Sequence, residues 1–422
     1  MSMDLFLALA VFIVTFAAIT IEKVHKTLVA LAGAMAVLLL GLISQEEAFE
    51  NVDWNVIFLL AGMMIIANTL RRTGVFEWLS FNIIDLAKGE PVRVMLLLST
   101  LTAGASALLD NVTTVVLMVP LTILVAKSLG LTPVPFLIAE VLASNIGGAA
   151  TLIGDPPNII IGSASGLDFG AFLLNMGPPV LLSYVAFLVM IVLFFRKDLK
   201  VPQERRAKAM AIDEVGLIHD RKLLTQALVV LALVIVGFLL HGALHLEAAT
   251  IALSGAVVLM LISGAEVPDM VSEIEWTTLL FFLGLFVLVE ALIKVGFVEI
   301  VARGLLDLTG GDPGMTAFLL LWVSGVASGI IDNIPYTATM VPIVQELGRT
   351  MPSEPLWWSL ALGACLGGNA TAVGASANVI VLSLAERAGY RVSFLQFLKY
   401  GVPVTVVSLL ISTVYVWLRY LI

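Results

Sequence analysis

The chain has 422 residues, of which 60% are hydrophobic and 13% are charged, and its mean hydropathy is +1.07. Soluble domains carry about 25% charged residues, so this composition excludes an ordinary soluble protein and indicates a polytopic membrane protein. The formal net charge of −9 points to no partner by itself, because orientation in a membrane depends on which side the cations occupy. The single cysteine, Cys365, excludes an intramolecular disulfide.

Apolar runs of about 20 residues predict membrane-spanning helices. The run from 94 to 126 contains one charged residue, Asp110, and is too long for one span but short for two. We expect a re-entrant hairpin there, with Asp110 and Asn111 at its tip. The other elements predicted in the first half are spans at 4–22, 27–43, 54–70 and 178–195, and a broken helix at 136–165.

The predicted broken helix contains the sequence NIGGAATLIGDPPNIII, which is apolar but rich in glycine and proline. A continuous helix avoids these residues, and a bilayer core rejects Asp155 unless protein or water surrounds it. The segment GGNATAVGASANVI resembles it 220 residues later. Matching pairs are Gly147 and Gly367, Gly148 and Gly368, Thr151 and Thr371, Gly154 and Gly374, and Asn158 and Asn378. We interpret the two segments as copies of one broken helix that face each other across a transport site.

The second half repeats the order of the first. VDWNVIFLLAG matches IEWTTLLFFLG, and LDNVTTVVLMVP matches IDNIPYTATMVP, both at an offset of 222 residues. Each half has five spans, an odd number, so the sequence predicts an all-α protein of two inverted repeats. The predicted units are the repeat 1–195, a cytoplasmic linker 196–222 and the repeat 223–422. The second repeat is expected to contain spans at 223–243, 248–264, 276–293 and 402–418, a hairpin at 315–344 and a broken helix at 356–385.

The distribution of Lys and Arg residues gives independent evidence for the orientation of the chain in the membrane. With the linker in the cytoplasm, 18 of the 22 Lys and Arg residues fall on the cytoplasmic side, among them Lys23 and Lys26 in the first turn. The positive-inside rule favours this orientation. We therefore expect a multi-pass protein of the inner (plasma) membrane with both termini outside, and hairpins that enter from opposite faces.

Polar residues are expected to meet near the membrane midplane. Half-helix ends offer carbonyl groups to a small cation and N–H groups to an anion, and glycines permit the backbone angles of a break and close approach of a ligand. Asparagine and threonine add neutral donors and acceptors. The candidate binding residues are Asp110, Asn111, Thr113, Asn145, Thr151, Gly154, Asp155, Asn158, Asp332, Asn333, Asn369, Thr371, Gly374, Ser376 and Asn378.

Three of these candidates, Asp110, Asp155 and Asp332, are carboxylates that could carry a coupling proton. Asp155 has no acidic counterpart in the repeat, where Ala375 stands, so it is the candidate for an asymmetric role. Alternatively, each tip aspartate caps the second hairpin helix, and the two roles are compatible. A Na⁺ site at the tips and breaks is a further alternative, and no other metal or cofactor is expected. Glu140 is either a proton site or a carboxyl group hydrogen-bonded to a neighbouring helix.

The motifs resemble the ion transporter superfamily over nearly the whole chain. LDNVTTVVLMVP, IAEVLASNIGGAATLIGDPPNIII and DNIPYTATMVP are most similar to the arsenite-permease-like branch, which includes ArsB-type arsenite permeases, NhaD-type sodium/proton antiporters and the P protein. The hairpin tips lack the Ser-Asn-Thr signature of the dicarboxylate symporters. The resemblance implies a secondary transporter without enzymatic activity, and a homodimer that moves in an elevator-like manner.

Several functions stay open at this level. The first is proton-coupled efflux of arsenite or an anion, with As(OH)₃ among Asn111, Asn333, Asn158 and Asn378. The others are a sodium/proton antiporter, a sodium-coupled dicarboxylate symporter, and a channel or pump subunit served by a separate soluble ATPase. The expected partners are the small solute and the lipid bilayer, with no nucleic acid.

Overall fold

The computed structural model describes residues 2–21, 23–210, 217–264 and 266–422. Within these ranges every regular element is a helix, which confirms the predicted all-α class. The helices of the first half are α1 (Met3–Ile21), α2 (Lys26–Leu39), α3 (Gln45–Glu50), α4 (Trp54–Arg72), α5 (Val75–Leu86), α6 (Pro91–Leu108), α7 (Asn111–Ser128), α8 (Val134–Gly148), α9 (Pro156–Ser165) and α10 (Phe169–Phe195).

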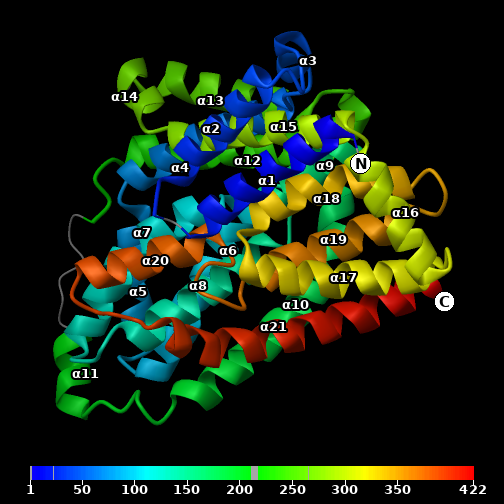
Figure 1. The fold of residues 1–422 in the computed structure, drawn as a ribbon. Helices are drawn as coiled ribbons and strands as arrows, with labels where there is room; N and C mark the ends of the chain where they lie inside the picture. Colours follow the sequence, from blue (N-terminus) through cyan, green and yellow to red (C-terminus); the bar gives the residue numbers. More distant parts are fainter. Residues whose placement is uncertain (1, 22, 211–216, 265) are drawn as a thin grey trace.

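The second half repeats this series, so that α12 corresponds to α1 and α21 to α10. The equivalent helices α5 and α16 lie at the left-hand and right-hand ends of the molecule in Figure 1, and α14 lies to the left of its equivalent α3, which is the arrangement expected of inverted repeats. The helices of this half are α12 (Arg221–Leu244), α13 (Ala248–Ser263), α14 (Val267–Ser272), α15 (Trp276–Lys294), α16 (Phe297–Thr309), α17 (Pro313–Ile330), α18 (Asn333–Leu347), α19 (Glu354–Gly367), α20 (Ser376–Arg387) and α21 (Phe394–Val416), continued by the π-helical turn η1 (Trp417–Leu421).

Both predicted hairpins and both predicted helix breaks are present. α6 and α7 meet at Leu109 and Asp110, whereas the seven residues 149–155 separate α8 from α9. The arms α6 and α7 have 18 residues each, which makes them about 27 Å long, close to the roughly 30 Å thickness of a bilayer core. The arms are therefore longer than the range 94–126 suggested, and their re-entrant path through a bilayer stays a prediction.

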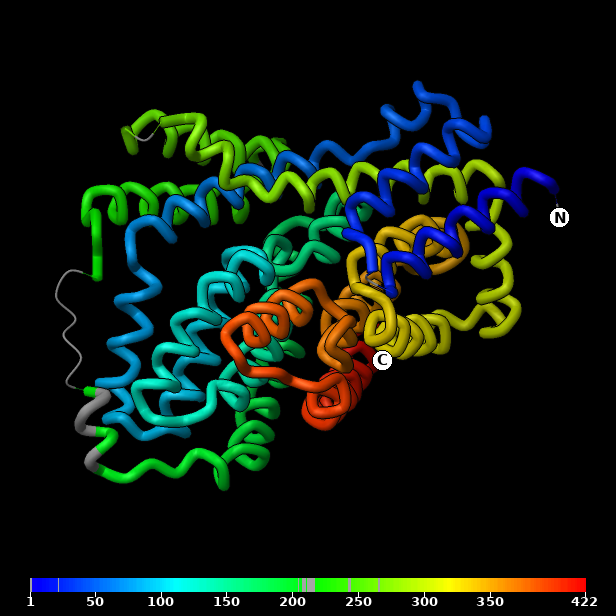
Figure 2. Tube along the Cα trace, turned by 60° about the vertical axis from the view of Figure 1, so that its left-hand side comes forward, coloured from blue at the N-terminus to red at the C-terminus, as the bar shows by residue number. Residues whose placement is uncertain are grey.

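The helices form two groups that pack against each other. One group, here called the upper layer, contains α1–α4 and α12–α15, and the other, the lower body, contains α5–α10 and α16–α21 (Figures 1 and 2). Two glycines allow close packing in the upper layer, because a Cβ atom at Gly62 would lie 2.7 Å from the backbone of Ala252 and one at Gly284 would lie 2.7 Å from that of Ala30. These two contacts are equivalent in the repeat, so the upper layer is held by the same crossing made twice.

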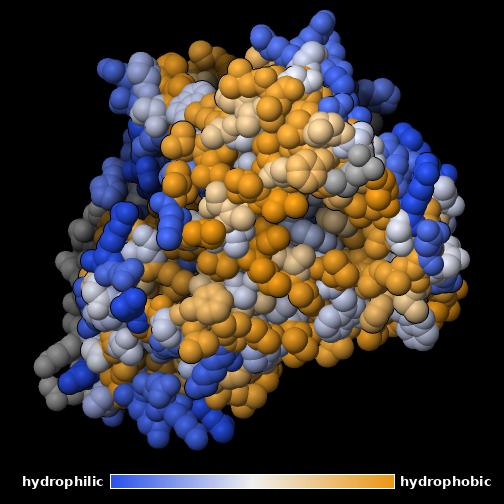
Figure 3. Space-filling view, viewed as in Figure 1, coloured by the Kyte–Doolittle hydropathy of each residue, from blue (hydrophilic) through white to orange (hydrophobic). Residues whose placement is uncertain are grey.

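Apolar side chains cover much of the outer surface. Hydrophobic residues dominate the face seen in Figure 3, and hydrophilic residues gather toward its edges. Among the described residues, nine helices are long and apolar enough to cross a membrane. An apolar belt of this kind suits contact with lipid chains, and the chain is accordingly a multi-pass membrane protein.

The predicted linker 196–222 follows the end of α10 at Phe195. It contains the short helix α11 (Gln203–Met210), and α12 begins at Arg221; residues 211–216 are outside the described part of the chain. In Figure 1, α11 lies at the left-hand end of the molecule, whereas the N- and C-termini both lie at the right-hand end.

Candidate functional site

Each hairpin tip begins with an aspartate that caps the helix after it. The carboxylate of Asp110 accepts a hydrogen bond from the backbone N–H of Thr113 at 2.8 Å and also pairs with the Thr113 hydroxyl. Asp332 accepts from the N–H of Ile334 at 3.0 Å. The predicted capping role is therefore confirmed, and it leaves room for a second role because a carboxylate has two acceptor oxygens.

Asp155, at the first helix break, lies fully buried between the two tips. The amide of Asn111 donates to Asp155 Oδ1 at 3.0 Å, and the amide of Asn333 approaches the two Asp155 oxygens at 3.4 and 3.3 Å. The Asp155 side chain does not cap its own helix. Pro156 and Pro157, the first two residues of α9, have no N–H group, and the N–H of Asn158 donates to the backbone carbonyl of Asp155 at 2.9 Å. One carboxyl group thus connects the tips of both repeats.

The two broken helices also contact each other through asparagine amides. Asn145 donates to the side-chain oxygens of Asn369 and Asn378 at 2.9 and 2.8 Å. Its own oxygen lies 3.5 Å from Nδ2 of Asn111, at the limit of a hydrogen bond. All four side chains are buried. The structure therefore brings the predicted residues of both repeats into one polar cluster.

Four of the candidates, Asn378 among them, hold the backbone of the breaks. Asn158 Nδ2 donates to two carbonyls of its own break at 3.2 and 2.8 Å, and Asn378 does the same at 2.8 Å twice. The hydroxyls of Thr151 and Thr371 each donate to a carbonyl of the adjacent hairpin at 2.6 Å. The amide N–H groups of Asn158 and Asn378 are thus engaged inside the protein, which differs from the expectation that both would face a solute.

Gly154 and Gly374 have a different purpose from the one expected. Neither has a positive φ, so the break does not need glycine for its backbone angles. A Cβ atom at Gly154 would lie 2.6 Å from the carbonyl oxygens of Gly148 and Ser106, and one at Gly374 would lie 2.7 Å from that of Gly368. The protein's own backbone fills the space that we expected a ligand to approach, so these glycines serve close packing between break and hairpin.

Lys26 is a site residue that the sequence analysis missed. Its Nζ atom lies 3.0 Å from Asp332 Oδ2 and 2.5 Å from the hydroxyl of Ser376. The Ser376 hydroxyl in turn donates to Asp332 at 2.5 Å. We expected Lys26 to be a surface cation of the first turn, but 306 residues separate it from the carboxylate that it contacts. The only signal in the sequence was that Lys26 matches Ala248 in the second repeat.

A cavity of about 550 Å³ reaches both hairpin tips. The titratable side chains among its described lining residues are Asp110, Glu275, Asp332, Lys26 and His25. Glu275 was also missed, although it lies in the repeated motif IEWTTLLFFLG at the position where the first repeat has an aspartate. Three carboxyl groups in one cavity with a single lysine favour a neutral or cationic occupant.

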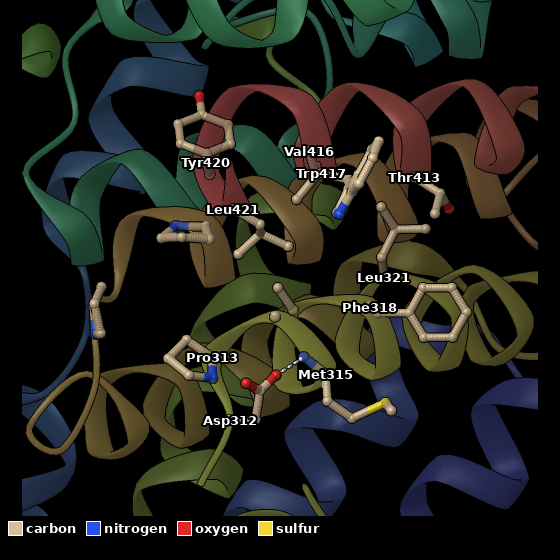
Figure 4. A pocket seen from close by; sticks show the side chains of 14 residues that line it. Asp312, Pro313, Met315, Phe318, Leu321, Thr413, Val416, Trp417, Tyr420 and Leu421 are labelled. Atoms are coloured by element: carbon tan, nitrogen blue, oxygen red, sulfur yellow. Dashed lines mark hydrogen bonds between the residues drawn. The ribbon is translucent and has the colours of Figure 1, made fainter.

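A second cavity, of about 690 Å³, lies far from this chemistry. It is enclosed by the start of α17 and the end of α21, where Phe318, Leu321 and Trp417 provide an apolar wall (Figure 4). Its acidic residue, Asp312, caps α17 by accepting from the N–H of Met315 at 2.6 Å. It contains none of the predicted site residues, so the smaller cavity at the tips is the candidate solute site.

Glu140 lies outside both cavities. One oxygen of its buried carboxyl group accepts a hydrogen bond from the hydroxyl of Thr122 on α7. This contact agrees with the second of the two alternatives, a carboxyl group hydrogen-bonded to a neighbouring helix.

Comparisons with known proteins are consistent with this architecture. A sequence model described as citrate transporter matches residues 16–363. An uncharacterized transporter of Mycobacterium tuberculosis is 48% identical over 98% of both chains, and a 46 kDa membrane protein of Mycobacterium leprae is 49% identical over 99% of both. The P protein of Sus scrofa is 34% identical over 94% of this chain and 57% of its own length. The YdaH transporter of Alcanivorax borkumensis has a similar fold, with a TM-score of 0.59 and 17% identity over 99% of this chain and 98% of its own.

Proposed function

The chain belongs to the citrate transporter family of secondary transporters, and from that premise we propose that it couples protons to the movement of a small polar solute, with arsenite as the leading substrate. The solute site would be the cavity at the hairpin tips, used by alternating access. The likeness of the motifs to the arsenite-permease-like branch supports this choice, as do the carboxyl groups that line the cavity and can accept hydrogen bonds from a neutral polyhydroxyl solute.

The observation that carries the proposal is the position of Asp155 between the hairpin tips of the two repeats. As a carboxylate it only accepts hydrogen bonds, and the amides of Asn111 and Asn333 donate to it. When Asp155 takes up a proton, its negative charge is lost and one of its oxygens becomes a donor, which weakens the hydrogen bonds that hold the two tip amides to it. A proton that changes how the tips are held gives the two access states different proton affinities, which is the condition for coupling.

Charge and backbone geometry both disfavour an anionic solute. Citrate or a dicarboxylate would add negative charge beside Asp110, Glu275 and Asp332, with Lys26 as the nearby cation. The first half-helix also lacks two N–H groups, since α9 begins with two prolines, and this weakens an anion site at its N-terminus. As(OH)₃ is neutral and can donate hydrogen bonds to carboxylates and amide oxygens.

A sodium/proton antiporter is the second candidate. The same excess of carboxyl groups that disfavours anions attracts a monovalent cation to the cavity. In both cases we propose that the protein lies in the inner (plasma) membrane with its termini outside. The excess of Lys and Arg on the linker side supports this orientation, as do the two termini at the opposite end of the molecule from α11.

The test uses purified protein in liposomes that contain a pH dye, with separate gradients of arsenite, sodium and citrate. We expect arsenite to drive proton movement, and Asp155→Asn to reduce the coupled rate roughly 5–150-fold, the range of a coupling free energy of about 1–3 kcal/mol. Asp168→Asn is the matched control, because Asp168 caps α10 and asparagine caps equally well.

Two results would change the proposal. Proton movement driven by sodium and not by arsenite would select the antiporter. Arsenite-driven proton movement that is unchanged in Asp155→Asn would remove Asp155 from the coupling role.

A further inference from the structure

The ammonium group of Lys26 is surrounded as a bound monovalent cation would be. It contacts the carboxylate of Asp332 at 3.0 Å and the hydroxyl of Ser376 at 2.5 Å, and it lies 5.0 Å from the centre of the Phe281 ring. A carboxylate, a hydroxyl and an aromatic face are all groups that attract a small cation. The second hairpin tip is thus a cation site whose occupant is tethered to the chain.

This arrangement occurs at one tip only. At an offset of 222 residues, Asp332 matches Asp110, but Lys26 matches Ala248. At the offset of the broken helices, Ser376 matches Pro156, which has no hydroxyl. The cation and its second ligand therefore do not follow from the repeated fold and belong to the second tip alone.

The ion pair also joins the two groups of helices. Lys26 begins α2 in the upper layer, where Thr27 donates to the carbonyl of Thr277 on α15 at 2.7 Å. Asp332 caps α18, and Ser376 begins α20; both helices belong to the lower body. A change of access that moves the upper layer relative to the lower body must therefore either break the ion pair between Lys26 and Asp332 or move both side chains so that the pair is kept.

We propose that Lys26 is a built-in substitute for a coupling cation, which neutralises Asp332 while the site is empty and leaves when a monovalent cation binds there. This inference rests on the proposed transport function. Burying an unpaired carboxylate is costly, so an empty carrier without the lysine could not readily change its access state. With the lysine in place, the empty carrier can change its access state, and net transport becomes possible. The other titratable groups of the cavity, Asp110, Glu275 and His25, remain available to the solute and to protons.

A sodium titration tests the cation site without any transport assay. The thermal midpoint of the purified protein is measured in NaCl, with choline chloride as the ionic-strength control, because a ligand stabilises the state that it binds. We expect Lys26→Met to reach half-maximal stabilisation at a sodium concentration about tenfold or more below that of the wild type. Lys26→Gln, which keeps a polar side chain without the charge, should show the same gain if Lys26→Met folds poorly.

Further variants locate the effect. Lys26→Arg should behave as the wild type, and Lys23→Met, which removes an exposed lysine of the same turn, should change nothing. The gain should disappear in the double variant Lys26→Met with Asp332→Asn. An unchanged sodium dependence in both Lys26→Met and Lys26→Gln, or a gain that survives Asp332→Asn, would overturn the proposal.

Liposomes provide the second readout. With arsenite on both sides, Lys26→Met should retain exchange, because the carrier then returns loaded; net efflux into arsenite-free medium should fall about tenfold or more. Equal loss of exchange and net efflux would contradict the substitute role. If the wild type moves no arsenite, the proposed substrate is wrong, and the sodium titration still decides the role of Lys26.

Discussion

Close packing between hairpin and broken helix makes a sharp prediction at Gly147, near the end of α8. A Cβ atom there would lie 2.2 Å from the carbonyl oxygen of Ala103 on α6 and 2.6 Å from its Cα atom. Ordinary contact begins near 3.4 Å, so Gly147→Ala requires the two helices to separate by about 1 Å. The neighbouring atoms belong to backbone, which cannot turn aside as a flexible side chain can.

The cost follows from two opposing effects. Overpacking of this kind costs about 1–3 kcal/mol, and contact with backbone places this site at the upper end, while alanine gains about 1 kcal/mol over glycine in helix propensity. The net loss of stability is therefore about 2 kcal/mol. Gly367→Ala should behave alike, since its Cβ atom would lie 2.5 Å from the carbonyl oxygen of Gly325 at the equivalent crossing of the second repeat.

Thermal unfolding of the purified protein in detergent measures the effect, and we expect the midpoint to fall by several degrees. Gly104→Ala is the matched control, because it lies next to Ala103 on α6 with nothing within 4 Å of its Cβ position. It should be neutral or slightly stabilising. If Gly147→Ala proves as stable as Gly104→Ala, the contact between hairpin and broken helix is looser than described and the reasoning fails.

Two further predictions concern single contacts. Thr371→Val removes the 2.6 Å hydrogen bond from the Thr371 hydroxyl to the carbonyl of Gly329 and should cost about 1 kcal/mol in the same unfolding assay, with Thr371→Ser as the variant that keeps the bond. At the surface, the hydrogen bond from Lys294 lowers the pKa of Glu47 from 4.5 to about 2. A lowered pKa stabilises the folded state at pH values above 4.5, and this contribution disappears as the pH falls toward 2. The difference in thermal midpoint between the wild type and Glu47→Gln should therefore be constant above pH 5 and should shrink as the pH falls from 4.5 to 2. A difference that stays constant down to pH 2 would argue against this ion pair.

The sequence alone predicted the elements that local patterns determine. Length and hydropathy indicate spans, and the repeated motifs place the tips at Asp110 and Asp332 and the breaks near Gly154 and Gly374. The observed helices agree with these positions, because runs of apolar residues, prolines and capping aspartates act over only a few neighbouring residues. The resemblance to the superfamily and to the P protein is also confirmed.

Only the tertiary structure decided which side chains meet. Asn145 contacts residues more than 220 positions away, and Lys26 contacts Asp332 across 306 positions. Such contacts depend on how the two repeats pack, and no local pattern encodes the distance between them. The same limit explains why the role of Gly154 and Gly374 was not predicted. Glycine is needed there because another backbone segment approaches closely, and not because of their own φ angles. Sequence therefore determined the two copies of the unit, and packing between the copies decided the partners of each polar group.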